Sequence, residues 1–464
     1  MTSSSSKSFK PRKLKLVASK KKLTNASGLG VMIEGFDSST LSEGFARCLP
    51  ERKSNRSLGS YRLGLIQLSS FLYGHDCIDD IIEFRSDPFL ESVMQGQTVL
   101  PRTMGNFLRD FSVENLSSMN RFLATQSQLN REHLLSLHSK QFEHRKLHLS
   151  IDSTPHEQCA KKMEGLAWNY KNMWCLDSQS IFDDFGLCYG MQLRPGNTKS
   201  GVDAEELIRS ALKSYKYSDE KYLSADSAYC NQEVIKVCLS LGVKFTIAAN
   251  QATTGWRDHV NEITHWEKWK YTESEIKKAK DREEDLPEIE LGRFHWRPSW
   301  NEALCFPVVV QRKAREQATL EDGAFEYYGI ITNHNLIKWS LQSVVEHYHK
   351  RGNVENFIRE EKYGYDLKHF PCQSLDANHA FGLIAMVANN LLRWVALIDR
   401  PTKTYFAKKF RRNYIHIPGH LVKHARSLVL KIPKHYLKEV NRLREGWQSH
   451  PAMSPAFTAG FSSG

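Results

Sequence analysis

Two segments of this sequence end in an aspartate that follows alternating apolar and polar residues, RKLHLSID at 145–152 and KYLSAD at 221–226. Such alternation predicts half-buried β-strands. Asp152 and Asp226 would then lie at strand ends, where a mixed α/β sheet usually places its functional site. Carboxylates from distant segments can bind divalent cations, but an aspartate that ends a strand is more often a turn former or a helix cap. These two segments alone leave both interpretations open.

A third acidic residue shares a helical segment with two cations and a phenol. The segment SVVEHYHKRGNVENFIREEKYGYD (343–366) contains, in the pattern Y-x2-R-x3-E-x6-K, Tyr348, Arg351, Glu355 and Lys362. A single helix over about 339–362, at about 100° per residue, would bring these four side chains within about 60° of one another. Such a face is either an exposed salt-bridge stripe or a DNA-facing surface that supplies one metal ligand and two phosphate-binding cations.

With these acids in this order, the chain resembles the DDE transposases of bacterial insertion sequences, and more closely their insertion-sequence thirteen-eighty group. The resemblance covers roughly residues 60–435, nearly the whole chain. The stretches that carry it are DDIIEFRSDP (79–88), GLAWNY (165–170), LRPGN (193–197), SADSAY (224–229), YYGIITN (327–333), YHKRGNVENFIREEKYGYD (348–366) and PGHLVKHARSLVLKIP (418–433).

The resemblance implies a fold class and a set of metal ligands. The fold is a ribonuclease-H-like mixed-sheet α/β core with a β-rich insertion, preceded by an α-helical N-terminal domain. Asp152, Asp226 and Glu355 are implied to be catalytic and to bind two Mg²⁺ ions per active site, with Mn²⁺ as a substitute. Two such ions stabilise the attacking and the leaving oxygen of a phosphoryl transfer.

The resemblance also implies DNA contacts near the cleaved end. In related enzymes the signature tyrosine, arginine and lysine bind phosphates, so Tyr348, Arg351 and Lys362 are expected to do so. Some relatives stack a flipped base on an aromatic residue just before a strand. Tyr328 holds that position here where a relative carries tryptophan, and packing of Tyr328 within its strand is the alternative.

Changes in residue pattern divide the chain into regions. Between about 60 and 140, short amphipathic helices favour a helix-turn-helix-like DNA-binding bundle, although a plain helical domain has the same periodicity. The interval 251–323 lacks clear α/β alternation, which indicates an insertion. The expected regions are a basic disordered arm (1–26), a helical DNA-binding domain (27–143), the catalytic core (144–250 and 324–400), an insertion subdomain (251–323) and a basic C-terminal region (401–464).

The composition indicates the partner and the compartment. The formal net charge of +12 favours an acidic polymer as partner, with nucleic acid first and anionic membrane a distant second. The resemblance implies that this polymer is double-stranded DNA. Nine cysteines without a C-x-x-C pair indicate a reducing compartment and argue against disulfides or structural zinc. The apolar run 380–398 contains Asn389, Asn390 and Arg393, so it predicts a buried helix and no membrane partner. We therefore expect a soluble, cytoplasmic protein associated with the bacterial nucleoid.

These observations predict a transposase that cleaves DNA at transposon ends and transfers the strands into target DNA by a cut-and-paste route. Its partners would be the inverted-repeat ends and the target duplex. Since paired ends need at least two active sites, a homodimer on DNA is expected. Two alternatives remain: a transposase-derived DNA-binding protein without catalysis, which typically loses acids, and a ribonuclease-H-fold nuclease that cuts without joining.

Overall fold

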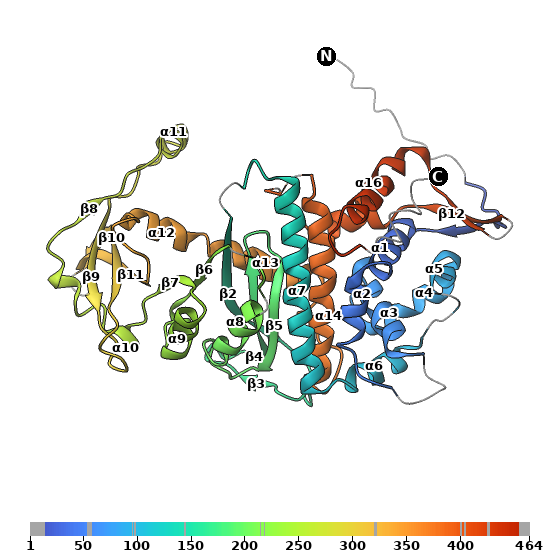
Figure 1. Cartoon of the computed structure of the whole chain (residues 1–464), viewed down its shortest axis with the longest axis horizontal. Helices are drawn as coiled ribbons and strands as arrows, with labels where there is room; N and C mark the ends of the chain where they lie inside the picture. Colours follow the sequence, from blue (N-terminus) through green and yellow to red (C-terminus); the bar gives the residue numbers. More distant parts are fainter. Residues whose placement is uncertain are drawn as a thin grey trace, which may run out of the picture.

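The computed structural model describes residues 14–52, 58–94, 96, 99–142, 145–213, 215–217, 219–319, 323–399, 401–402, 405–424 and 427–453. The molecule is elongated (Figure 1). A mixed sheet forms its centre, an antiparallel extension of that sheet forms one end, and a helical lobe forms the other.

The central sheet follows from the alternating segments noted above. Its strands lie in the order β5-β4-β2-β6-β7, in which β4 runs antiparallel to both of its neighbours, β5 and β2, and β6 and β7 run parallel to β2. Along the chain, the core elements follow one another as three strands, a helix, a strand, a helix and a strand. They are β2 (Lys146–Glu157), β4 (Trp174–Asp183), β5 (Cys188–Pro195), α8 (Ala204–Lys213), β6 (Glu220–Ala225), α9 (Gln232–Ser240) and β7 (Lys244–Ala248).

The interval predicted to be an insertion extends the same sheet. β11 pairs antiparallel with β7, and β10, β9 and β8 follow outward, while β3 lies at the opposite edge, giving ten strands in all. The interval is thus β-rich and continuous with the central strands. Its elements are α10 (Gln251–Thr254), η3 (Val260–Glu262), β8 (Glu267–Lys268), α11 (Glu273–Asp281), β9 (Ile289–Trp296) and β10 (Phe306–Thr319). The strand that follows it, β11 (Gly323–Thr332), joins it to β7.

Two long helices, α7 (Val113–Leu137) and α14 (Leu375–Leu397), lie side by side against β5 (Figure 1). Buried amides join them to the strand: the Asn120 side chain accepts from and donates to the backbone of Met191, and the Asn390 side chain does the same with Cys188. Within the described residues, α14 is the one helix long and apolar enough to cross a membrane, and 94% of that apolar window is buried. The prediction of a buried helix is confirmed.

The helical lobe contains both ends of the described chain. α16 packs on α1, and β1 pairs with β12, which pairs with β13. The lobe comprises β1 (Lys22–Thr24), α1 (Ser27–Asp37), α2 (Thr40–Ala46), α3 (Ser60–Tyr73), η1 (Ile78–Ile82), α4 (Glu83–Ser86), α5 (Pro88–Val93), α6 (Pro101–Arg109), α15 (Ala407–Phe410), η4 (Arg411–Ile415), β12 (Gly419–His424), β13 (Ser427–Lys431), η5 (Lys434–Tyr436) and α16 (Leu437–Gln448).

One expected boundary differs in the structure. The basic arm was expected to be disordered through residue 26, but Lys22–Thr24 form strand β1, because β12 supplies an antiparallel partner from the far end of the sequence. Residues 1–13 of that arm lie outside the described part. The C-terminal region folds back onto α1 through α16.

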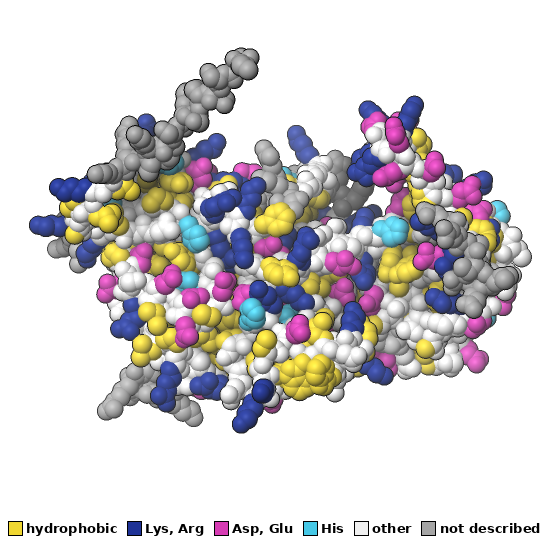
Figure 2. Space-filling model, turned by 180° about the vertical axis from the view of Figure 1, so that it is seen from behind, with side chains coloured by type: hydrophobic (Ala, Val, Ile, Leu, Met, Phe, Trp, Pro, Cys, Tyr) yellow, Lys and Arg dark blue, Asp and Glu magenta, His cyan; other side chains and the backbone are white. Residues whose placement is uncertain are grey.

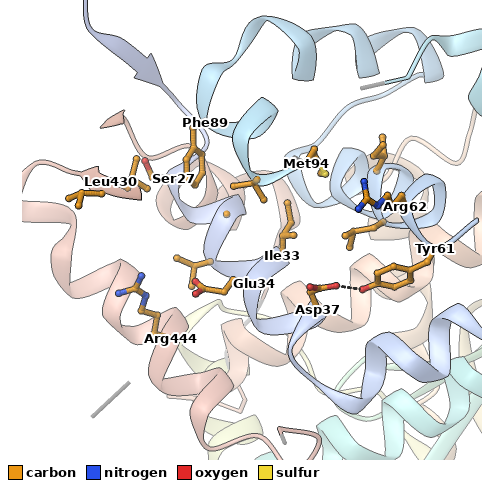
Figure 3. A pocket seen from close by; sticks show the side chains of 16 residues that line it. Ser27, Ile33, Glu34, Asp37, Tyr61, Arg62, Phe89, Met94, Leu430 and Arg444 are labelled. Carbon is orange, nitrogen blue, oxygen red and sulfur yellow. Dashed lines mark hydrogen bonds between the residues drawn. The ribbon is translucent and has the colours of Figure 1, made fainter. Parts of the chain in front are cut away.

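A cavity of about 790 Å³ lies in this lobe between α1, α3, α5, β13 and α16 (Figure 3). Its wall mixes apolar side chains with the charged side chains of Glu34, Asp37, Arg62 and Arg444. The Tyr61 hydroxyl donates to Asp37 across 2.6 Å. None of the candidate catalytic carboxylates lines this cavity. They lie at the central sheet and on a helix beside it.

Candidate active site

Asp152 lies in the middle of β2 and not at the strand end that the alternation predicted. β2 continues to Glu157 because its second half keeps its pairing with β4 as far as Cys175. The Asp152 side chain is 14% exposed, and one carboxylate oxygen accepts from the Ser153 backbone N–H at 2.9 Å. Burial raises the pKa of Asp152 to about 6, Arg351 opposes that rise, and Asp226 adds to it.

Asp226 comes directly after β6, the parallel neighbour of β2. Ser150 pairs with Ser224 in the register of these strands, and each aspartate lies two residues further along its chain. The two carboxylates therefore lie at the same level on adjacent strands. Asp226 also accepts from the Ala228 backbone N–H at 2.9 Å and caps η2 (Ser227–Tyr229), so it fulfils the helix-cap interpretation as well.

Glu355 approaches these aspartates from the first turn of α13 (Gly352–Gly364). A guanidinium nitrogen of Arg351 lies 3.6 Å from a carboxylate oxygen of Asp152 and 3.6 Å from one of Glu355. The Glu355 side chain is 70% exposed, whereas Asp152 is largely enclosed. Arg351 thus bridges an enclosed acid on the sheet and an open acid on the helix.

The carboxylates of this site have the chemistry of divalent-cation ligands but are not gathered around one point. Among the described residues, no three histidine, cysteine, aspartate or glutamate side chains are close enough together to hold a metal ion. The chemistry nevertheless fits: carboxylate oxygens suit Mg²⁺, and Asp152 and Asp226 repel each other in a setting where a cation would relieve the repulsion. In the described arrangement, Arg351 supplies the positive charge between Asp152 and Glu355.

The single helix predicted over 339–362 is wrong. Two helices, α12 (Leu341–His349) and α13, meet at Lys350 and Arg351. At the junction the backbone N–H of Arg351 donates to the carbonyl of Tyr348, and that of Val354 to Arg351, each three residues back. Such bonds tighten the turn relative to an α-helix, and Gly352 beside them is a poor helix former. The expected common face is therefore interrupted.

Tyr348, on α12, is buried against β11, the strand that follows the expected insertion. Its hydroxyl lies 2.5 Å from that of Tyr328, and the ring centroids are 5.6 Å apart. Burial raises the pKa of Tyr348, with the Tyr328 hydrogen bond adding to the effect. The Tyr328 ring remains 41% exposed. The structure thus brings the two candidate DNA-contacting tyrosines together from a strand and a helix, at positions twenty residues apart in the chain.

Lys362 points at the strand that carries Asp152. Its ammonium donates to the carbonyl of Pro155 at 2.7 Å, three residues beyond the aspartate. Burial lowers the pKa of Lys362, while Glu361 and Asp177 oppose that effect. The cation is therefore half-buried along β2 and does not share an exposed stripe with Glu355.

A buried histidine relay supports this arrangement, and the sequence analysis did not identify it. His148 on β2 is hydrogen-bonded to Ser224 (2.8 Å), Ser224 to Thr246 on β7 (2.9 Å), and Thr246 to His347 on α12 (3.0 Å). The rings of His148 and His347 stack at 4.2 Å. The relay ties both aspartate-bearing strands to the helix of Tyr348. One signal was available: the alternation places His148 and Ser224 on the same strand faces as the two aspartates.

Sequence comparisons supply a family. No curated protein matches the chain. The sequence model of the family described as Transposase DDE domain group 1 matches residues 6–445, which is nearly the whole chain and includes every residue of the site described above. A match of this extent, together with acidic residues on two adjacent strands and a nearby helix, identifies the family. The chain belongs to the Transposase DDE domain group 1 family.

Proposed function

We propose that this protein is a cut-and-paste DNA transposase that cleaves at transposon ends and joins the freed 3′ ends to target DNA. Membership of a DDE transposase family supports the transposase function itself. The cut-and-paste proposal rests on one observation: Asp152 and Asp226 lie at the same level on adjacent parallel strands, and Arg351 links Glu355 to Asp152.

We propose further that the core is ribonuclease-H-like. The strand order β5-β4-β2-β6-β7, with antiparallel pairing confined to the first three strands, supports this assignment. The division into a catalytic core (144–250 and 324–400) interrupted by an insertion (251–323) remains part of the proposal. So does the assignment to the insertion-sequence thirteen-eighty group, which rests on the Y-R-E-K signature.

The three carboxylates are proposed to hold two Mg²⁺ ions, replaceable by Mn²⁺. When bound, such ions stabilise charge on the attacking and leaving oxygens. Asp152 and Asp226 would fix their position, because both are held by backbone N–H groups. Glu355, largely exposed, is free to approach from α13. Arg351 would turn from the carboxylates to the scissile phosphate, for which its planar donors are suited.

The remaining signature residues would position DNA. Tyr348 and Tyr328 present paired hydroxyls beside Arg351, where they can donate to a phosphate oxygen. The surface accords with a polyanionic partner: Figure 2 shows lysine and arginine side chains grouped over the middle of one face, with acidic and hydrophobic side chains among them. The proposed partners are transposon ends and target duplex, bound by a homodimer in the bacterial cytoplasm.

The test is an in vitro reaction of purified protein with Mg²⁺ on a duplex that carries the flanking inverted repeat. Asp152→Asn, Asp226→Asn and Glu355→Gln remove the charges with little change in shape. We expect each to abolish cleavage and joining while end binding persists. Glu360→Gln on the same helix serves as the control. Parent protein that binds ends but never cuts would favour a binding protein, and cutting without joining would favour a nuclease.

A further inference from the structure

The connection between β2 and β4 presents exposed aromatic rings on an ordered hairpin. This aromatic hairpin, residues 158–174, contains β3 (Ala167–Trp168), which pairs with the start of β4. Trp168 is 63% exposed and Tyr170 is 85% exposed. Trp168 lies against Trp174, with ring centroids 5.5 Å apart. Large exposed aromatics on well-formed structure are typical of binding surfaces.

Hydrogen bonds hold the tip of the hairpin in one conformation. The Asn169 side-chain oxygen accepts from the backbone N–H groups of Lys171 (2.9 Å) and Met173 (3.0 Å). The Asn169 backbone N–H donates to the carbonyl of Met173 at 3.0 Å. Asn172 adopts a positive φ of 55°, which closes the turn. The two exposed rings are therefore presented without a large loss of conformational entropy on binding.

The hairpin carries an excess of positive charge. Lys161, Lys162 and Lys171 are exposed, and the Lys171 ammonium lies 5.4 Å from the centre of the Tyr170 ring. The acidic residue between them, Glu164, is engaged elsewhere, since its carboxylate accepts from the Leu375 backbone N–H at the start of α14 (2.9 Å). Lysines interleaved with exposed aromatics favour a nucleic acid over an apolar protein face, because the rings stack on bases while the cations bind phosphates.

The hairpin continues the strand of the catalytic site. On β4, Trp174, the partner of Trp168, lies six positions before Ser180, the partner of Asp152, which is a span of about 20 Å in an extended strand. Lys362 donates to Pro155 on this path. A cation and then two aromatic rings thus follow one another along the sheet away from Asp152.

We propose that the aromatic hairpin is a second DNA contact, which stacks unpaired bases of the strand that leaves the active site on Trp168 and Tyr170. This inference rests on the proposed function for its position in the reaction, but the contact itself is a binding property. The bases occupy the exposed rings, and Lys161, Lys162 and Lys171 neutralise the adjoining phosphates.

The test is DNA affinity measured by fluorescence anisotropy in EDTA, so that binding is separated from cleavage. The probes are a blunt duplex of arbitrary sequence and the same duplex with a six-nucleotide single-stranded overhang. The wild type should bind the overhang duplex more tightly. Trp168→Ala with Tyr170→Ala should weaken binding of the overhang duplex roughly tenfold or more and binding of the blunt duplex little. Trp168→Phe with Tyr170→Phe should retain most of the affinity.

Equal affinity of the wild type and the alanine variant for the overhang duplex would overturn the proposal. So would a change of oligomeric state in the alanine variant, measured by sedimentation, without a change in DNA affinity, since the rings would then contact a second copy of the chain. Overhang binding by a protein that never cleaves would contradict the proposed function and leave the stacking contact in place.

Discussion

The hydroxyl of Tyr328 on β11 lies 2.5 Å from the hydroxyl of Tyr348 on α12, so the strand that follows the expected insertion and the helix of Tyr348 meet beside the candidate catalytic carboxylates. One of the two hydroxyls donates to the other, whose own hydrogen stays available to a third group. Because Arg351 follows Tyr348 by less than one helical turn, a displacement of β11 would also move Arg351 relative to Asp152.

The tyrosine pair should be energetically coupled. Tyr328→Phe and Tyr348→Phe should each lower the free energy of unfolding by about 1 kcal/mol, and the double variant should lose less than the sum, because the second change removes no further bond. Urea unfolding of the four proteins measures the coupling. Tyr363→Phe, at an exposed site on α13, is the control. Strict additivity would show that the hydroxyls do not interact.

Arg351→Lys should slow cleavage by on the order of 10²-fold with end binding little changed. Lysine keeps the charge, but its ammonium lacks the planar set of donors with which a guanidinium binds two carboxylates or a phosphate. Single-turnover cleavage rates and gel-shift affinities on the same duplex separate the two effects. Arg359→Lys, on the same helix, where the arginine donates a hydrogen bond to Asn356, should cleave at the parental rate. Parental cleavage by Arg351→Lys would exclude a role for the planar guanidinium.

Thr246→Val should destabilise the fold by about 1–3 kcal/mol, since valine leaves Ser224 and His347 without a shared buried partner. The isosteric change keeps the packing volume, so the loss reports the hydrogen bonds. Thr253→Val, at an exposed position, should change stability by no more than about 0.5 kcal/mol. Chemical denaturation at pH 8 gives both values, and equal midpoints for the two variants would refute the relay's contribution.

The buried histidines should make unfolding easier in acid. Burial lowers the pKa of His334 and His148 to about 4, against an ordinary value of 6.5. Between pH 6.5 and 4, these histidines are protonated in the unfolded chain but largely neutral in the native protein. The free energy of unfolding therefore falls as the pH decreases. One histidine contributes up to about 1.4 kcal/mol per pH unit.

Burial raises the pKa of Asp183 and Glu361 to about 7, so these carboxyls stabilise the native protein as the pH falls and oppose the effect of the histidines. A histidine variant therefore separates the two contributions. In His334→Gln, the free energy of unfolding should fall less steeply from pH 6.5 to 4 than in the parent. Parallel pH profiles for the two proteins would show that His334 is not held neutral.

The strands of the core could be predicted because alternation is a local property. Leu147, Leu149 and Ile151 are all buried, as their period of two required. The extent of β2 could not be predicted, since its continuation past Asp152 depends on pairing with β4, a segment more than twenty residues away. The same holds for β1, whose partner β12 lies at the far end of the sequence.

The resemblance indicates which carboxylates to propose as catalytic, but it does not predict their surroundings. Periodicity treats the segment of Tyr348 and Glu355 as one helix, because a tightened turn at Arg351 changes no residue type. The histidine relay draws one residue from each of four elements and therefore has no spacing to detect. Contacts between distant segments, and not the motifs themselves, decide how the signature residues are oriented.

The antiparallel pairing of β11 with β7 bears on how this protein could be shortened. Ile330, Ile331 and Thr332 cover the outer edge of β7 at Ala248, Ile247 and Thr246. Excision of the insertion together with β11 would strip that edge of its partner and offer its unpaired N–H and C=O groups to other chains. The shortened protein would then expose an unpaired strand edge and aggregate. The pairing of β11 with β7 therefore limits how far the chain can be shortened while it stays monodisperse.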